Sequence, residues 1–342
     1  MSRIKNKIVT FGEVLLRICP SDPGVRLDVP SKYNLSPAGS EANVAVALAN
    51  LNLPVEFITS LPDDALGQMI IKEIRKHGVN VNNVIFQPGR TGLFFQERGF
   101  GVRPSFVIYD RENSTFSKTQ MGNFNWHSIW QGIGWFHVSG IVPAVSKQSC
   151  LCLKQIIQKM PKRNIFSVDL NYRQKLWGWI KGNKNKISRI MTEICKKADL
   201  ICANETDLYE VFGYDKKMDF HATAKEIFSY FPRLKYLAIS IRQSESATNN
   251  VWSGKLFIRD KSCFVSREYK LDSIVDRVGT GDAFTAGIIY GIINFSQNQQ
   301  KIVDFAVALS ALNHSTFGDF SSFTKQDVDN VLSSGGSGRI IR

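Results

Sequence analysis

The stretch DSIVDRVGTGDAFTAGIIYG, residues 272–291, joins a glycine-rich turn to a small, apolar run of helical character. The turn Gly279-Thr280-Gly281-Asp282 leaves backbone N–H groups unpaired at the positive end of the helix dipole, where they can bind phosphate or developing negative charge. Asp282 falls on the first helical turn, where its carboxylate stays ionised and can accept a proton from a hydroxyl. An anion hole beside a base suits phosphoryl transfer to an alcohol. On spacing alone, a plain strand-to-helix turn capped by Asp is an equal alternative.

The same stretch resembles the carboxy-terminal signature of the ribokinase-like (PfkB) carbohydrate kinases, D-x-x-G-x-G-D-x-F-x-x-G, which it matches from Asp276 to Gly287. A second segment, PAGSEANVAVALANL at residues 37–51, resembles the family's G-G-x-x-x-N motif before an alanine-rich helix. The resemblance implies that the backbone at Gly39 and the side chain of Asn43 hold sugar hydroxyls. A satisfied residue at a helix start is the structural alternative for Asn43.

The second motif carries two further expectations. Ser40 is predicted to cap the helix, because a serine side chain can accept a hydrogen bond from the first-turn N–H groups. The first glycine of the family motif is Ala38 here, which narrows the space beside the substrate.

Composition limits the classes of function. The chain has 342 residues, 43% of them hydrophobic, which is ample for a large core, and no window of about 18 apolar residues that could span a membrane. Its six cysteines form no CxxC pair and fit small core residues of a reducing cytoplasm. The net charge of +13 invites a nucleic-acid function, but the lysines are scattered and no nucleic-acid-binding motif organises them. A basic cleft also attracts anionic substrates such as nucleotides.

Apolar strand-like segments alternate with helix-like segments along the chain, which predicts a mostly parallel sheet with helices on both faces. Two segments without helices, 13–36 and 91–111, interrupt this pattern and are expected to form a small β-sheet lid that excludes water from the site. The resemblance implies the same lid on a three-layer ribokinase-like α/β fold, with residues 1–342 as one domain. Residues 333–342 read as a flexible tail.

Two shorter segments carry local predictions. Residues 14–35, which contain Pro20, Pro23 and Pro30, look irregular or edge-like. Residues 251–258 suggest a hairpin around Ser253-Gly254.

Arginines follow two predicted strands, at the edge where open α/β sheets bind ligands. Arg111 in YDR and Arg173 in DLNYRQKLW each stand beside a tyrosine, and together they could form a forked clamp for a carboxylate. Either arginine alone is more often solvated. These phrases resemble the 2-keto-3-deoxygluconate kinases within the family, which implies a sugar acid bound by Tyr109, Arg111 and Arg173. Phe94 stands where relatives place a tyrosine, so one hydroxyl contact is expected to be missing.

Metal sites are implied at two places. Asn204-Glu205-Thr206-Asp207 resembles the family's N-x-x-E motif, which organises Mg²⁺ and phosphate waters. Asp207 is one methylene shorter than Glu and would reach the metal through water, while an acidic first helical turn is the structural alternative. Asp276 is implied in a loop for a monovalent cation such as K⁺.

The resemblance also implies which residues bind the nucleotide, and Asn204 of the N-x-x-E-like motif is one of them. The segment RQSESA resembles one found in bacterial keto-deoxy sugar kinases, which places Arg242 and Ser244 near the phosphates of ATP, together with Gly279 and Gly281. A plain surface loop is the alternative for Arg242. His314 is implied to line the adenine pocket, although a histidine at a helix end is more often structural.

We therefore expect a cytoplasmic, homo-oligomeric kinase that phosphorylates 2-keto-3-deoxygluconate with MgATP, without a nucleic-acid or membrane partner. The alternatives are a kinase of a neutral sugar such as fructose or ribose, a nucleoside kinase, and an inactive sugar-binding regulator. The intact Asp282 and its glycines disfavour the inactive regulator.

Overall fold

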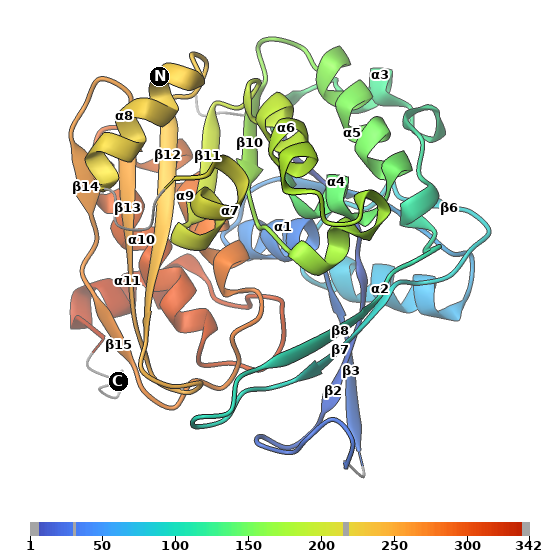
Figure 1. The fold of residues 1–342 in the computed structure, drawn as a ribbon, viewed down its shortest axis with the longest axis horizontal. Coiled ribbons are helices and arrows are strands. Elements are labelled where there is room, and N and C mark those ends of the chain that lie inside the picture. The colour runs from blue at the N-terminus through green and yellow to red at the C-terminus, as the bar shows by residue number, and fades with distance from the viewer. Residues whose placement is uncertain (1–6, 30–31, 215–218, 337–342) are drawn as a thin grey trace.

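A mostly parallel sheet forms the centre of the molecule in the computed structural model, which describes residues 7–29, 32–214 and 219–336 (Figure 1). Six neighbouring strands are parallel, and the strands at one edge are antiparallel. The sheet runs β4 (Val55–Ile58), β1 (Lys7–Phe11), β9 (Ile133–Ser139), β10 (Ile165–Asp169), β11 (Leu200–Asn204), β12 (Tyr236–Ser244), β13 (Asn250–Ile258) and β14 (Cys263–Val265), with β15 (Tyr269–Leu271) also paired to β13.

Both faces of this sheet are buried, because successive strand residues enter two separate apolar cores. Ile8 and Val9 of β1 belong to opposite cores, as do Trp135 and Phe136 of β9. One core is covered by α1 (Ser40–Asn50), α2 (Ala65–Lys76), α9 (Thr280–Asn294), α10 (Gln299–Asn313) and α11 (Lys325–Ser334). The other is covered by α3 (Trp126–Ile129), α4 (Ile141–Val145), α5 (Lys147–Lys159), α6 (Lys184–Cys195), α7 (Glu205–Phe212) and α8 (Phe220–Tyr230), with the 3₁₀ turns η1 (Phe116–Lys118), η2 (Met121–Asn123) and η3 (Gln174–Ile180) in the same layer.

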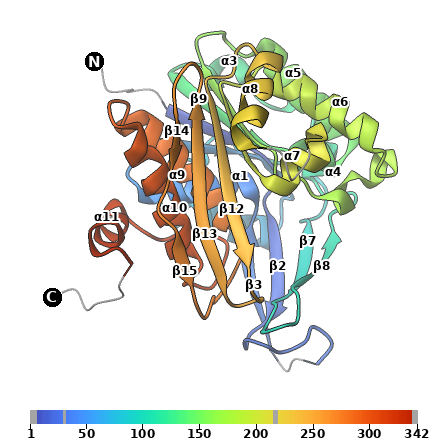
Figure 2. The same cartoon turned by 60° about the vertical axis from the view of Figure 1, so that its left-hand side comes forward.

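A separate four-stranded sheet projects from the edge of the body where the parallel strands end (Figures 1 and 2). Its strands follow the order β3 (Tyr33–Ala38), β2 (Leu15–Pro20), β7 (Leu93–Glu97) and β8 (Phe106–Asp110). These strands arise from the two segments predicted to form a lid, with β3 running two residues beyond the first of them. A further pair, β5 (Ser60–Leu61) and β6 (Ile85–Phe86), lies outside both sheets. The predicted α/β class, with helices on both faces of a mostly parallel sheet plus a small second sheet, is confirmed.

Two local predictions need correction. Residues 14–35 are not irregular throughout, since they supply β2 and the first half of β3, but β3 is an edge strand of the second sheet, as the edge-like alternative predicts. Residues 251–258 do not form a hairpin but lie within the continuous strand β13. Gly254 is required there for packing rather than for a turn, because a Cβ on it would approach Phe284 and Val307 of the covering helices to 2.9 Å.

The C-terminal prediction is partly outside the described residues. Ser333 and Ser334 belong to the end of helix α11 instead of a flexible tail. Residues 337–342 are not described. Among the described residues, no helix combines the length and apolarity needed to cross a bilayer.

Candidate active site

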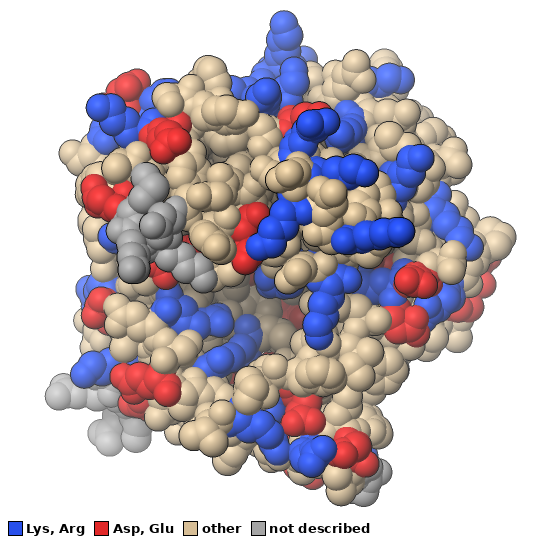
Figure 3. Space-filling model, in the orientation of Figure 1, with Lys and Arg blue, Asp and Glu red and all other residues tan. Residues whose placement is uncertain are grey.

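A cavity of about 1040 Å³ opens at the carboxyl ends of the parallel strands, beneath the lid. Figure 3 shows a hollow on this face, bordered by Lys and Arg side chains. The body contributes the ends of β10, β11 and β12 and the beginnings of α1 and α9, and the lid contributes Leu15, Phe94, Gln96 and Tyr109. Segments far apart in the sequence thus meet where open α/β sheets place their ligands.

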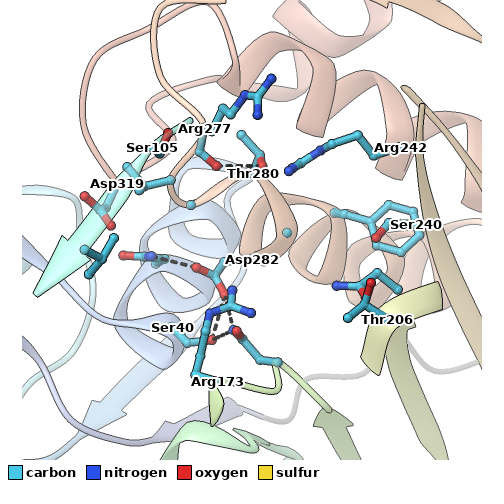
Figure 4. Close-up of a pocket in the computed structure, with 18 of the residues that line it drawn as sticks. Ser40, Ser105, Arg173, Thr206, Ser240, Arg242, Arg277, Thr280, Asp282 and Asp319 are labelled. Carbon is cyan, nitrogen blue, oxygen red and sulfur yellow. Dashed lines mark hydrogen bonds between the residues drawn. The ribbon is translucent and has the colours of Figure 1, made fainter. Parts of the chain in front are cut away.

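Asp282 lies in this cavity on the first turn of α9, and its carboxylate is held from two sides (Figure 4). Ser40 Oγ donates to Oδ1 at 2.6 Å, and Asn43 Nδ2 donates to Oδ2 at 2.7 Å. Burial raises the pKa of Asp282, while these hydrogen bonds and the charge of Arg173 lower it. A desolvated carboxylate with a raised pKa is a stronger proton acceptor than an exposed one, as a general base requires.

The predicted capping role of Ser40 is wrong. The N-cap of α1 is Gly39, which has no side-chain cap, and the Ser40 hydroxyl points across to Asp282 instead. Gly39 and Asn43 both line the cavity, as expected for residues beside a sugar. Gly39 also allows a close approach, since a Cβ there would lie 2.4 Å from the carbonyl oxygen of Glu13.

The glycine-rich turn opens helix α9 as the sequence predicts. Gly279 is the N-cap with φ of 71°, a left-handed conformation that favours glycine. A Cβ on Gly281 would meet no other atom within 4 Å, so this glycine faces open space in the cavity. The first N–H groups of a helix lack intrahelical partners, and here they border a cavity wide enough for a phosphate.

Three arginines reach the cavity without a carboxylate partner. Among the described residues, no acidic oxygen lies within 4 Å of the guanidinium groups of Arg173, Arg242 or Arg277. Arg173 is exposed and lies next to Asp282, whereas Arg242 and Arg277 lie on the other side of the α9 turn, near Thr280 (Figure 4). Unpaired cations focus a positive potential that attracts anionic ligands.

Arg242 and Arg277 are held by different contacts. The guanidinium of Arg242 stands 5.1 Å from the ring centre of Trp252, and although the side chain is exposed, partial loss of water around it and the nearby charge of Arg277 lower its pKa. Arg277 Nη2 donates to the Ser246 carbonyl at 2.5 Å. Arg277 was not among the residues predicted from the sequence. Its position inside the signature stretch, directly before the glycine-rich turn, is the signal that would have found it.

Arg111 differs from its predicted partner Arg173. It lines the cavity but is buried, and its Nε and Nη2 both lie 2.6 Å from Oε2 of Glu13. Glu13 Oε1 accepts a further bond from Ser114 Oγ at 2.5 Å. Both arginines of the expected clamp thus line the cavity, Arg111 paired with Glu13 and Arg173 without an acidic partner among the described residues, and their joint grip on a carboxylate stays a prediction. Phe94 and Tyr109 line the cavity with ring centres 6.4 Å apart.

On the nucleotide side, Asn204 and Asp207 form a reciprocal cap at the start of α7. Asn204 Oδ1 accepts from the Asp207 N–H at 2.8 Å, and Asp207 Oδ2 accepts from the Asn204 N–H at 3.1 Å. Asp207 Oδ1 also accepts from the Tyr172 N–H at 3.0 Å. Among the described residues, no group of three or more His, Cys, Asp or Glu could hold a metal ion. Both carboxylate oxygens of Asp207 accept backbone N–H groups, and its contact with Mg²⁺ through water stays a prediction.

His314 is placed differently from the prediction. Its ring is buried, Nδ1 lies 2.8 Å from the Ser310 carbonyl oxygen, and burial lowers its pKa to about 3. It does not line the cavity but packs edge-on behind Trp252, which does, at 5.1 Å between ring centres. Ser244 lines the cavity at the end of β12, and its contact with the phosphates of ATP stays a prediction.

Asp276 does not fit a monovalent cation. Its Oδ1 accepts from the Arg277 N–H at 2.9 Å, and its Oδ2 accepts from Arg17 Nη2 at 2.5 Å and from the Gly318 N–H at 3.4 Å. Both carboxylate oxygens are thus occupied by donors, one of them the positive charge of Arg17. The K⁺ site expected at Asp276 is corrected accordingly.

The chain resembles known sugar kinases over almost its whole length. It is 27% identical over 333 residues to a 2-dehydro-3-deoxygalactonokinase of Haloferax volcanii, covering 97% of this chain and 98% of the relative. It is also 27% identical over 337 residues to fructokinase-1 of Oryza sativa subsp. japonica, covering 96% of this chain and 98% of that protein. The crystal structure of a 2-dehydro-3-deoxygluconokinase from Thermotoga maritima is similar with a TM-score of 0.90 at 34% identity, covering 96% and 98% of the two chains. The model of the pfkB family carbohydrate kinases matches residues 5–326, and the chain accordingly belongs to the pfkB family.

Proposed function

We propose that this ATP-dependent carbohydrate kinase phosphorylates 2-keto-3-deoxygluconate, giving 2-keto-3-deoxy-6-phosphogluconate. The observation that carries the proposal is Arg173, an arginine beside the base for which the described part of the chain offers no acidic partner. Nη1 of Arg173 donates to the Tyr172 carbonyl at 3.0 Å, which leaves the other guanidinium donors for a substrate carboxylate. The names of the Haloferax volcanii and Thermotoga maritima relatives support a sugar acid.

In the proposed reaction, Asp282 accepts the proton of the sugar hydroxyl while that oxygen attacks the γ-phosphorus of ATP, and ADP leaves with the bridging oxygen. The N–H groups of the turn around Gly281 hold the charge of the transferring phosphoryl group. Arg242 and Arg277 bind the remaining phosphates. Bound Mg²⁺ neutralises charge on the phosphate oxygens.

The alternative is a neutral sugar, since the fructokinase from rice matches at the same identity as the sugar-acid kinase from Haloferax volcanii. A neutral sugar has no use for the unpaired charge of Arg173 on the sugar side. Cytoplasmic location and a homo-oligomeric state stay predictions, the first supported by six free cysteines.

The test of the substrate is an ADP-release assay of Arg173→Met and Arg173→Lys on sugar acids, fructose, ribose and nucleosides. A charge-assisted hydrogen bond contributes about 1.5–3 kcal/mol, so Arg173→Met should lose roughly ten- to a hundred-fold in kcat/KM on 2-keto-3-deoxygluconate. Its residual activity on a neutral sugar should change little. Arg173→Lys should keep more of the kcat/KM on 2-keto-3-deoxygluconate than Arg173→Met but less than wild type, because lysine keeps the charge and loses the planar fork.

The control is Lys186→Met, which removes one positive charge from an exposed position of α6 outside the cavity. It should match wild type on every substrate. Equal losses of Arg173→Met on acidic and neutral sugars would assign Arg173 to the phosphoryl group instead. A wild-type preference for fructose, ribose or a nucleoside would reject the sugar acid and keep the kinase.

A further inference from the structure

Arg17 is a completely buried arginine on lid strand β2, and both of its terminal nitrogens are held by carboxylates. Nη2 donates to Asp276 Oδ2 at 2.5 Å, and Nη1 donates to Asp319 Oδ2 at 3.0 Å. The ring of Phe317 covers the guanidinium, 4.9 Å from its carbon atom. Burying a charge is costly unless it is paired and hydrogen-bonded. This cluster is therefore a specific assembly, and the reaction described above does not use it.

Both acidic partners of Arg17 adjoin the glycine-rich turn that begins α9. Asp276 precedes the turn, and its Oδ1 accepts from the Arg277 N–H at the start of that turn. Asp319 approaches from the other side, because its carbonyl oxygen lies so close that a Cβ on Gly279 would be 2.1 Å away. Gly279, with its positive φ, therefore lies between the segments that contain Asp276 and Asp319, and Arg17 joins these two segments.

We propose that Arg17 is a positioning residue for the anion hole, and that its guanidinium is the built-in cation of the Asp276–Asp319 cluster in place of a monovalent metal ion. The inference rests on the proposed role of the glycine-rich turn in holding the phosphoryl group. Two buried carboxylates repel each other unless a cation lies between them. Without Arg17 they separate or one takes up a proton, and the turn between them shifts.

A small shift of the turn has a large effect on the reaction. Anion-hole donors stabilise the transition state only within hydrogen-bond distance of the developing charge, and they contribute about 10²–10³ in kcat each. The same guanidinium fastens strand β2 to the body, so this strand of the lid and the anion hole form one rigid unit.

The test compares Arg17→Met and Arg17→Lys with Arg98→Met. Arg98 is a matched control, since it is also a buried arginine of the lid and lies over the same Phe317 ring at 5.0 Å. Among the residues that the structure describes, it donates to the carbonyls of Pro20 and Ser21 and to no carboxylate. Arg17→Met should lower kcat by about 10²-fold with the sugar KM changed less than about three-fold, whereas Arg98→Met should leave kcat near wild type. Arg17→Lys should recover part of the loss.

Two further measurements give readouts that general destabilisation does not produce. In Arg17→Ala, millimolar guanidinium chloride should raise kcat by about tenfold or more over an equal concentration of sodium chloride. In Arg17→Met without nucleotide, backbone amides of residues 277–283 should exchange faster than in wild type and in Arg98→Met.

A last measurement tests the potassium dependence of the wild-type enzyme. Wild-type kcat should agree within about two-fold in potassium, sodium and tetramethylammonium chloride at equal ionic strength. A strict potassium requirement of wild type would overturn the inference, even if the Arg17 variants fail to fold. Wild-type kcat in Arg17→Met would overturn it as well. If Gly281→Val is impaired while Arg17→Met is not, only the role of Arg17 fails. If both turn over normally, the anion hole itself is misassigned.

Discussion

At the scale of the residue, both oxygens of the Asp282 carboxylate accept hydrogen bonds, and Asn171 Nδ2 adds a longer one to Oδ1 at 3.4 Å. Ser40 holds Oδ1 and Asn43 holds Oδ2. Asn171 Nδ2 adds a bond to Ser40 Oγ at 3.0 Å, which fixes the direction in which that hydroxyl donates. The carboxylate therefore has one orientation, set before any substrate arrives, and preorganisation of this kind lowers the barrier to reaction.

Replacing Asp282 by Asn should reduce kcat by about 10²–10⁴, the usual contribution of a general base, because the amide keeps the shape but cannot take up a proton. The fold and ATP binding should persist, since the Ser40 hydroxyl can turn to accept a bond. Steady-state assays measure the loss of kcat, and calorimetric titration with ATP measures the retained nucleotide binding. Turnover equal to wild type in this variant would remove Asp282 from the role of base.

At the scale of the element, helix α9 uses glycine for two different purposes. Gly281 faces the open cavity, whereas a Cβ on Gly287 would lie 2.5 Å from Cα of Ala306. Gly287 thus allows α9 and α10 to approach closely, and Gly281 leaves room for a ligand.

This difference predicts opposite effects for the two glycines. Gly281→Val should keep the thermal midpoint of wild type but lose about 10²-fold in kcat, because its side chain fills the space of the phosphoryl group. Gly287→Val should instead lower the midpoint strongly through overpacking, by an amount equivalent to about 1–3 kcal/mol or more. Thermal unfolding and initial rates of both variants test whether Gly281→Val loses turnover and Gly287→Val loses stability. A Gly281→Val enzyme within about two-fold of wild-type turnover would speak against the anion hole.

The elements were largely predictable from the sequence because periodicity is local, and most predicted strands and helices exist near their expected places. The failures came from residues whose partners are distant. Gly254 looked like a turn residue but makes room for helices, and Ser40 looked like a cap but faces Asp282. Arg17 drew no attention because its partners Asp276 and Asp319 lie 259 and 302 residues away.

At the scale of the whole molecule, the lid touches the body at both of its ends. Arg17 fastens β2 at the base, and at the tip the Ala247 N–H donates to the Gly101 carbonyl at 2.7 Å. Lys175 Nζ also donates to the Val107 carbonyl of β8 at 3.3 Å. The contact at Ala247 brings the tip to the loop that leads away from β12 toward the nucleotide side.

Hydrogen exchange should therefore divide the lid into two parts. Amides of β2 should be protected with or without substrate, because Arg17 anchors this strand, whereas amides of residues 93–110 should gain protection when sugar binds. Low ATPase activity without sugar should accompany this difference. Identical exchange of residues 93–110 in the free and sugar-bound enzyme would mean that the second sheet is a fixed wall.

The packing of α1 on α9 has a consequence for how the protein is made. Helix α1 is synthesised early and is mostly apolar and almost entirely buried, yet α9 begins only at residue 280. A chain still emerging from the ribosome exposes that helix, the kind of surface that makes folding intermediates prone to aggregate. Ser40 and Asn43 are likewise made long before the carboxylate that they hold. Phosphoryl transfer is thus impossible for any nascent chain, and the activity appears only with the final part of synthesis.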